Sequence, residues 1–381
     1  MAVNCLCEDK VMKRIGLLTM HRVINFGSIL QAYATQLVVE KFGYDCTIID
    51  YQYPNKIHPQ DRVNLITRVG RFILQLKNGC PYYKQKKEFA RFQRNNLKLS
   101  RHYSSKRDLQ ENFDSYYDAV IVGSDQTWNV RHIGEDDSFL LPFVSDDVKK
   151  ISYASSAARK TLPQKYEKTF KKMLSRFFAI SVRENNTRIL VNNLIGVDAP
   201  VTLDPTLLVS KDEWMSVADK SRIKKKIKGP FILAYILKYS FDPYPLATDV
   251  IRKVYKKYKM PVVCIRYSVK EKLGIPGTLQ LNEAISPEDF LWLFANASFV
   301  ISSSFHGTAF SVNFERPFYS IVNHEIDDDR IMSLLNSLGL MNRAVSKLDE
   351  LGEITEIDYE PISKALSSLK EGSITFLKEN L

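Results

Sequence analysis

The chain has 381 residues, a formal net charge of +11, 45% apolar residues and 25% charged residues. This length favours two domains, and the composition is typical of a soluble globular protein. The longest apolar run, at 231–237, is too short for a membrane helix, which needs about 20 residues, and the N-terminus has no apolar core for a secretory signal. Five scattered cysteines favour neither disulfides nor a metal site, so we expect a cytoplasmic protein that holds no metal.

Strand and helix patterns alternate along the first half of the chain. Short apolar runs are typical of buried parallel strands, and they predict strands at 14–20, 45–51, 117–124, 149–156 and 177–184. A helix is predicted at 28–43, and a further apolar run at 201–208 closes this half. We interpret 1–220 as an N-terminal Rossmann-like domain.

A basic insertion at about 57–112 interrupts this domain, and lysines and arginines far outnumber acids at 62–107. Its apolar residues recur at helical spacing, so one interpretation is amphipathic helices with solvated basic faces. The aromatic residues among the basic ones also fit a nucleic-acid surface. Contact with an anionic glycan, or with the inner membrane as a peripheral protein, is favoured over nucleic acid, which we do not expect as a partner.

A charged stretch that ends in Gly229 and Pro230 predicts a linker to a second domain. Strands are then predicted at 231–237, 261–267, 299–304 and 317–322, with helices near 242–259, 286–297 and 308–314. We interpret 221–345 as a C-terminal Rossmann-like domain and 346–381 as a helical tail. Alternation in two blocks indicates an α/β protein with two doubly wound domains.

Polar segments follow five of the apolar runs: "HRVINFGS", "GSDQTWN", "RENNT", "DPT" and "SSSFHGT". In open α/β sheets, ligands bind beyond the carboxyl ends of the strands. One such loop would be ordinary turn chemistry, but five similarly placed loops predict a shared crevice between two domains.

The last of these loops begins a helix at His306. A helix N-terminus carries unpaired N–H groups and partial positive charge, and Gly307 would let a ligand approach the backbone. Ser304, Thr308 and His306 add donors, so the loop predicts an anion-binding site whose imidazole could also move a proton. The alternative is an N-cap cluster with a histidine satisfied in the core.

Each of the other candidate residues fits either a role in binding or catalysis or an ordinary structural role. Arg183 could hold a carboxylate or phosphate, or pair with a neighbouring acid. Asp125 could act as a base, accept a sugar hydroxyl or cap a helix. Asn25 and Gly27 could bring backbone amides near a ligand or form a plain strand–helix turn, and Asp204, before a proline, fits a turn or a cap at least as well as catalysis.

Five motifs in this order resemble the polysaccharide pyruvyl transferase family: "INFGSILQAYA", "IVGSDQTWN", "ISVREN", "LDPTLL" and "SSSFHGTAFSVNFERPF". The resemblance spans roughly 14–340. It implies two facing Rossmann-like domains similar to the GT-B glycosyltransferases, with 1–220 on the acceptor side and 221–345 on the donor side. It also implies transfer of the pyruvyl group of phosphoenolpyruvate, with no other cofactor, to two hydroxyls of a sugar in a bacterial surface polysaccharide or exopolysaccharide, which forms a ketal.

The resemblance also implies roles for single residues. His306 and Asp125 would be catalytic; the donor would contact Arg183, Ser304, Gly307, Thr308 and Arg330; the acceptor would contact Asn25, Gly27, Gln126 and Trp128. The family often has an arginine where this chain has Ser304 and an aspartate where it has Ser28. Arg330 or Arg266 is our candidate for the replacement cation.

The acceptor is expected to be an acidic or neutral glycan, free or lipid-linked. Two other functions fit the same crevice. One is a glycosyltransferase that uses a nucleotide sugar, and the other is a relative without catalysis that binds a glycan or a membrane-linked intermediate.

Overall fold

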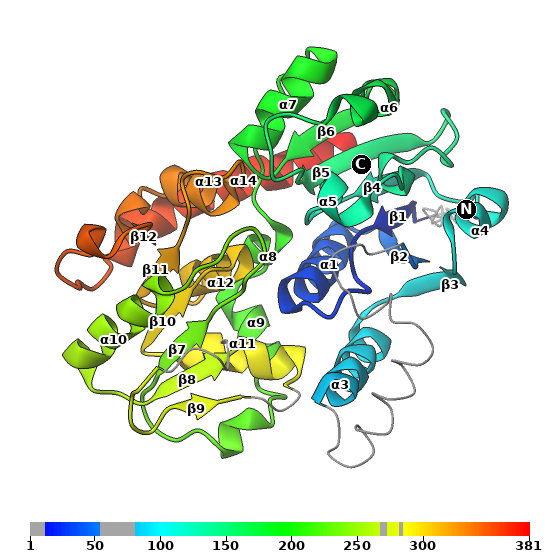
Figure 1. Cartoon of the computed structure of the whole chain (residues 1–381). Coiled ribbons are helices and arrows are strands. Elements are labelled where there is room, and N and C mark those ends of the chain that lie inside the picture. Colours follow the sequence, from blue (N-terminus) through cyan, green and yellow to red (C-terminus); the bar gives the residue numbers. More distant parts are fainter. Residues whose placement is uncertain (1–11, 54–80, 267–272, 282–284) are drawn as a thin grey trace, which may run out of the picture.

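A computed structural model describes residues 12–53, 81–266, 273–281 and 285–381. Two α/β domains lie side by side, each built on one parallel sheet with helices packed against it (Figure 1). The described helices are α1 (Phe26–Lys41), α3 (Pro81–Asn96), α4 (Lys106–Asn112), α5 (Val130–Ile133), α6 (Gln164–Leu174), α7 (Asn185–Ile195), α8 (Pro205–Leu208), α9 (Lys211–Ala218), α10 (Leu246–Tyr258), α11 (Pro287–Asn296), α12 (Phe305–Asn313), α13 (Arg330–Ser337) and α14 (Tyr359–Asn380).

The first sheet has the strand order β3-β2-β1-β4-β5-β6, and all of its pairings are parallel. Its strands are β1 (Arg14–Leu18), β2 (Asp45–Tyr51), β3 (Leu99–Tyr103), β4 (Ala119–Val122), β5 (Lys149–Ser155) and β6 (Ala179–Val182). Strands β1 and β4 are almost wholly buried, as expected for a sheet covered on both faces.

The second sheet has the order β12-β11-β10-β7-β8-β9, again parallel throughout. Its strands are β7 (Ile232–Tyr235), β8 (Val262–Ile265), β9 (Leu279–Gln280), β10 (Phe299–Ser302), β11 (Phe318–Ile321) and β12 (Ala344–Val345). Counted from its own first strand, this sheet repeats the order of the first sheet. Both therefore have the strand order of the Rossmann fold, and their switch points lie between β1 and β4 and between β7 and β10.

The two domains pack together through an aromatic cluster. Phe26, at the start of α1, stacks on Phe290 of α11 with ring centroids 4.6 Å apart, and Phe89 of α3 lies 5.2 Å away. Beside the cluster, Arg91 of α3 pairs with the buried Glu288 of α11 at 3.0 Å. This contact fixes α1 and α3 of the first domain against α11 of the second.

The C-terminal helix α14 returns to the first domain. Ser373 accepts a hydrogen bond from the Leu203 amide at 3.0 Å, and the Lys149 ammonium of β5 donates to the carbonyl of Asn380 (Figure 1). In the described part of the chain, no helix is long and apolar enough to cross a membrane.

The structure corrects two sequence predictions. The run at 201–208 is not a strand, because Val201 makes only an isolated bridge to Val182 and α8 begins at Pro205. The basic insertion is not wholly helical, since it contains the edge strand β3. The helix predicted from the apolar spacing at 65–76 lies outside the described residues.

Candidate functional site

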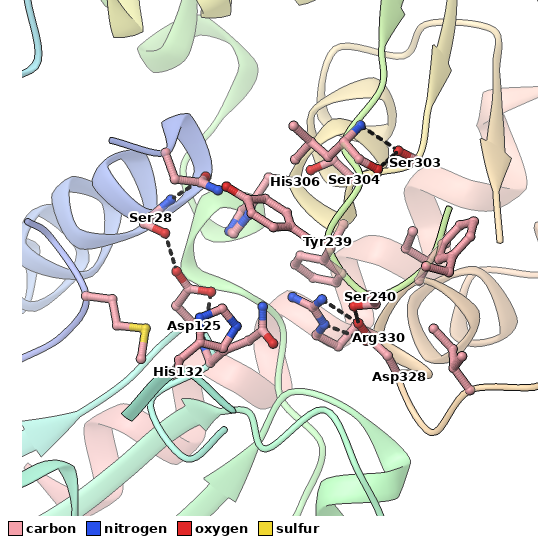
Figure 2. A pocket seen from close by; sticks show the side chains of 18 of the residues that line it. Ser28, Asp125, His132, Tyr239, Ser240, Ser303, Ser304, His306, Asp328 and Arg330 are labelled. Atoms are coloured by element: carbon pink, nitrogen blue, oxygen red, sulfur yellow. Dashed lines mark hydrogen bonds and ion pairs between the residues drawn. The ribbon is translucent and has the colours of Figure 1, made fainter. Parts of the chain in front are cut away.

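A pocket lies between the domains, at the carboxyl ends of the central strands of both sheets. Figure 2 shows Ser28, Asp125 and His132 on one side, and Ser240, Asp328 and Arg330 on the other. The polar and aromatic side chains of its wall are Asn25, Ser28, Tyr53, Asp125, Gln126, His132, Tyr239, Ser240, Phe241, Ser303, Ser304, Phe305, His306, Asn323, Asp328 and Arg330. The predicted crevice is therefore present, and loops from both domains form it.

His306 lies in the first turn of α12, where Ser304 caps the helix by accepting the Gly307 amide at 3.4 Å. The imidazole reaches across to the first domain and rests on Gly27 of α1. A Cβ atom at Gly27 would lie 1.9 Å from His306 Nδ1, so the ring fits there only because residue 27 has no side chain. His306 is 6% exposed, and its Nε2 makes no hydrogen bond with any described residue.

A buried ion network lies behind the pocket and joins four of the predicted loops. Arg183 Nη1 donates to Asp204 Oδ2 at 2.8 Å, and His306 Nε2 lies 3.5 Å from the same oxygen. Arg183 Nη2 lies 3.6 Å from Asp125 Oδ1. Burial by itself would raise the pKa of Asp204, but the charges of His306 and Arg183 outweigh burial and lower it.

Asp125 faces the pocket from the loop after β4. Its backbone has a φ of 75°, the left-handed region that few residues other than glycine adopt and that is common at functional sites. Ser28 donates to Asp125 Oδ2 at 2.5 Å, and the Gln126 amide donates to Oδ1 at 2.9 Å. Burial would raise the pKa of Asp125, but nearby positive charges, Arg183 first, lower it, so this carboxylate is ionised at neutral pH.

Glu184 is a second buried acid, next to Arg183 in sequence. Its Oε1 accepts hydrogen bonds from the Ser156 hydroxyl, the Ala158 amide and the Thr187 hydroxyl. Its Oε2 lies 3.9 Å from Arg183 Nε, and neither atom has a hydrogen-bond partner among the described residues. Burial raises the pKa of Glu184 to about 7, so this group changes charge near neutral pH.

Arg330 supplies a guanidinium to the pocket wall from the start of α13. It forms two parallel hydrogen bonds to Asp328, both 2.6 Å long, and Ser240 donates to the same carboxylate at 2.6 Å. The Arg330 side chain is 12% exposed, so its position is fixed by these bonds and by packing. The other candidate cation, Arg266, does not line the pocket and contacts the Ile24 carbonyl at 3.5 Å.

Five predicted site residues are not part of the pocket wall. The Gly27 amide donates to Asn25 Oδ1 and the His306 ring lies against this glycine, so Gly27 does not offer its amide to an acceptor. Trp128 is fully buried and donates to the Phe139 carbonyl, so it cannot contact an acceptor. The Thr308 hydroxyl bonds within its own helix and to Ser320. Gly307 provides room for Ser302 rather than for a ligand. Arg183 lies beneath the Phe305 ring, 4.4 Å from its centroid, and its side chain is 1% exposed.

The other predicted residues line the pocket wall or lie directly behind it. Asn25 lines the pocket, but its Oδ1 caps α1 by accepting from the Gly27 and Ser28 amides. Gln126 lines the pocket, and its side chain accepts a hydrogen bond from Asn129. Asp204 caps α8 by accepting from the Thr206 amide at 3.0 Å, as its position before a proline predicted.

Sequence reasoning missed His132, Tyr53 and Tyr239 of the wall. A signal for Tyr239 existed, because it follows the apolar run of β7 just as the other polar loops follow theirs. Tyr53 follows β2 at least as closely as Tyr239 follows β7, so the same signal existed for it. His132 lies much further beyond β4, where the distance along the chain no longer indicates which way a side chain points.

The site can be compared with known proteins. A family model described as polysaccharide pyruvyl transferase matches residues 25–325, most of the chain. No curated protein matches the chain at a significant level.

Solved structures with the same architecture have little sequence in common with the chain. A UDP-GlcNAc 2-epimerase from Methanocaldococcus jannaschii is 11% identical with a TM-score of 0.50, covering 93% of this chain and 92% of that one. A glycosyltransferase from Rickettsia africae is 11% identical with a TM-score of 0.50, covering 97% and 94%. At such identity the similarity shows the fold alone, and it confirms the predicted α/β fold of two facing Rossmann-like domains in the GT-B arrangement.

Proposed function

Because the chain belongs to the polysaccharide pyruvyl transferase family, and is thus a transferase, we propose that it moves the pyruvyl group of phosphoenolpyruvate onto a sugar of a bacterial surface polysaccharide. The main support is the convergence of His306, Asp125 and Arg330 from both domains on one pocket. An imidazole, an ionised carboxylate and a fixed guanidinium are the groups that this reaction requires.

The donor is placed against the second domain. A proton from the His306 imidazole would add to C3 of the enol phosphate, and a sugar hydroxyl would attack the oxocarbenium-like C2 and return its proton to the imidazole. The C2–O bond to phosphate then breaks, the second hydroxyl closes the ketal at C2, and its proton leaves with the phosphate. Arg330 would hold an anionic group of the donor, with Ser303 and Ser304 as hydroxyl donors beside it.

The acceptor is placed against the first domain. Asp125, with its lowered pKa, would accept a hydrogen bond from the attacking hydroxyl and orient it, and Gln126 would contact the sugar beside it. Tyr53 and Tyr239 supply aromatic rings at the wall, and such rings suit the apolar face of a pyranose. Arg183 would act from behind, by fixing Asp125 and Asp204.

The basic insertion would hold the enzyme near a lipid-linked acceptor at the inner membrane. Lys84, Lys86 and Lys87 are exposed on α3, the described part of this segment. Each basic residue near an anionic surface contributes about 1 kcal/mol. Reversing the charge of Lys86 and Lys87 should release the protein from vesicles that contain anionic lipid, whereas unchanged binding would exclude this role.

The direct test is incubation with phosphoenolpyruvate and a panel of glycans. We expect release of inorganic phosphate and a glycan product heavier by one pyruvyl group. His306→Ala should reduce the rate by about 100-fold or more, since positioned acid–base groups contribute roughly 10²–10⁴-fold. Thermal stabilisation by nucleotide sugars, and none by phosphoenolpyruvate, would instead indicate a glycosyltransferase. No turnover of any glycan, with normal function of His306→Ala in cells, would indicate a binding protein.

The role of Arg330 is tested separately by donor affinity. Arg330→Lys keeps the charge but loses the two parallel bonds, and we expect about tenfold weaker binding of phosphoenolpyruvate. Arg107→Lys, at an exposed position on α4, is the matched control. If Arg330→Ala binds the donor as well as the wild type does, this assignment is wrong.

A further inference from the structure

A second pocket lies on the second domain, beside the edge strand β12. Its volume is about 430 Å³, which falls within the range of pockets that hold small molecules. Among its lining residues, Tyr319 and Arg343 are buried, whereas His324, Asn342 and Glu353 are exposed. The second pocket therefore has a covered floor and opens to the surface of the protein.

This second pocket adjoins the crevice between the domains. Met332 of α13 lines both pockets. In the loop after β11, Asn323 lines the first pocket and His324, the next residue, lines the second. A chain-like ligand that leaves the crevice past Met332 therefore enters the second pocket, and the side chain that it passes is unbranched and adaptable.

The segment 350–355, which forms one wall of the second pocket, is held in place by three cations. Arg343 donates to the carbonyl of Thr355 at 2.9 Å and to its hydroxyl at 3.2 Å. Lys253 and Lys257 of α10 donate to two further backbone carbonyls of the same segment. The wall is therefore formed before a ligand binds, which lowers the entropy cost of binding.

The lining of the second pocket suits a sugar better than a phosphate. Glu350 and Glu353 place two carboxylates there, which would repel an anion, and the Arg343 guanidinium is already bonded to the wall. Carboxylate, amide and hydroxyl oxygens, by contrast, accept hydrogen bonds from sugar hydroxyls. Met332 and Met341 add apolar surface on which a pyranose ring can pack, and Met341 is 40% exposed.

We propose that the second pocket binds a sugar of the acceptor glycan other than the one that reacts. The reacting sugar would lie beside Asp125, and the glycan would run past Met332 along the second domain. This inference rests on the proposed function, and it adds that the acceptor is an oligosaccharide or a polysaccharide rather than a single sugar. Two linked contacts favour a long acceptor, because binding at one pocket raises the effective concentration of the glycan at the other.

The binding test applies the labelled full chain to an array of bacterial surface oligosaccharides and their component monosaccharides. Affinity for the oligosaccharide that binds best is then measured by titration calorimetry in Asn342→Ala and Glu353→Ala. Both residues are exposed in the lining, so the fold should be kept. Each variant should bind about fivefold more weakly, because a hydrogen bond is lost. Asn193→Ala on α7 and Glu371→Ala on α14, also exposed, are the matched controls and should resemble wild type.

An affinity of the wild type for the oligosaccharide no higher than for its terminal monosaccharide, or wild-type affinity in both variants, overturns the proposal. In the phosphoenolpyruvate assay, the two variants should raise the KM for the oligosaccharide rather than lower kcat, as expected for loss of uniform binding. If oligosaccharides bind through the second pocket but none gains a pyruvyl group, the proposed function fails and the second pocket stands. Pyruvyl transfer with an unchanged KM in both variants supports the function and overturns the role of the second pocket.

Discussion

The first turns of α1 and α12 face each other across the crevice and are built alike. Helix α1 follows β1, the first strand of its domain, and α12 follows β10, the fourth strand of its domain. The Asn25 side chain caps α1, and the Ser304 side chain caps α12. Each has phenylalanine as its first helical residue. Phe26 packs in the aromatic cluster between the domains, whereas Phe305 covers the buried guanidinium of Arg183.

The glycines in these two turns serve different purposes. Gly27 leaves space for the His306 ring of the opposite domain, while Gly307 leaves space for Ser302 of its own domain. In α1, the glycine therefore makes room for the imidazole of the facing domain. In α12, the glycine lets the helix pack closely on its own sheet. Substitutions at the two glycines should separate loss of activity from loss of stability.

The largest effect is expected from Gly27→Ala. The new Cβ would lie 1.9 Å from His306 Nδ1, so the buried ring must shift. A misplacement of about 1 Å can cost roughly 100-fold in rate, and we expect a loss of that size in the pyruvyl transfer assay. Gly372→Ala is the control, since nothing lies within 4 Å of its Cβ position. Full activity in Gly27→Ala would show that the position of the ring is not critical.

A double-mutant cycle tests the same contact by stability. Gly27→Ala should lower the free energy of unfolding in the wild type but not in His306→Ala, because the smaller side chain removes the clash. Equal losses in both backgrounds, measured by urea denaturation, would mean that the cost at Gly27 arises elsewhere.

Gly307→Ala should mainly affect stability. Its Cβ would lie 2.1 Å from Ser302 Oγ and 2.8 Å from Ser302 Cβ. That hydroxyl is held by bonds to the Tyr235 carbonyl and the Ser304 amide, so it cannot simply turn away. We expect a loss of about 1–3 kcal/mol in unfolding free energy by urea denaturation. Wild-type stability would show that α12 can move from its sheet at no cost.

The first turn of α7 differs from those of α1 and α12, because side chains of the second domain cap it. Asp329 accepts from the Asn186 amide and Ser333 from the Asn185 amide, whereas Glu184, the residue before the helix, turns its carboxyl inward.

This inward carboxyl should make stability depend on pH. The pKa of Glu184 rises from an ordinary value of 4.5 to about 7 on folding, so its contribution to stability is full below pH 4.5 and is lost as the pH rises through 7. Glu184→Gln should remove that decline, a difference on the order of 1–3 kcal/mol at pH 7 and above. Parallel curves of unfolding free energy between pH 5 and 8 would contradict this.

The smallest effect is expected far from the crevice, at Gly372 in the middle of α14. Nothing lies within 4 Å of its Cβ position and its backbone is helical. Gly372→Ala should raise the unfolding free energy by about 0.5–1 kcal/mol without changing activity, because alanine loses less backbone entropy in a helix. A lower melting temperature would indicate an unseen contact at this face.

The sequence predicted those features that depend on neighbours along the chain. Strand β2 was predicted at 45–51 and is observed at Asp45–Tyr51, because a buried parallel strand is a continuous apolar run. The helix predicted near 286–297 is observed as α11, where Ser286 is the cap and Pro287 the first helical residue, since capping bonds join residues two or three positions apart. The short strands β9 and β12 were missed, because two residues carry no detectable pattern.

Within the site, the sequence indicated which loops meet, because all of them except the one at Asp204 follow strands of parallel sheets. It did not indicate which side chains face the pocket. Trp128 and Thr308 were predicted to touch ligands and are buried, since a loop residue can point to either side. Arg183 was chosen as a donor ligand, but the Phe305 ring covers it and Asp204 pairs with it.

By itself, the amino-acid sequence determined the order of strands and helices, the helix caps and the family, because these depend on local pattern and motif order. Only the tertiary structure decided that the His306 ring rests on Gly27 and that the Phe305 ring covers Arg183. Such contacts join residues far apart in the chain, and their geometry is set by how two separately patterned sheets pack against each other.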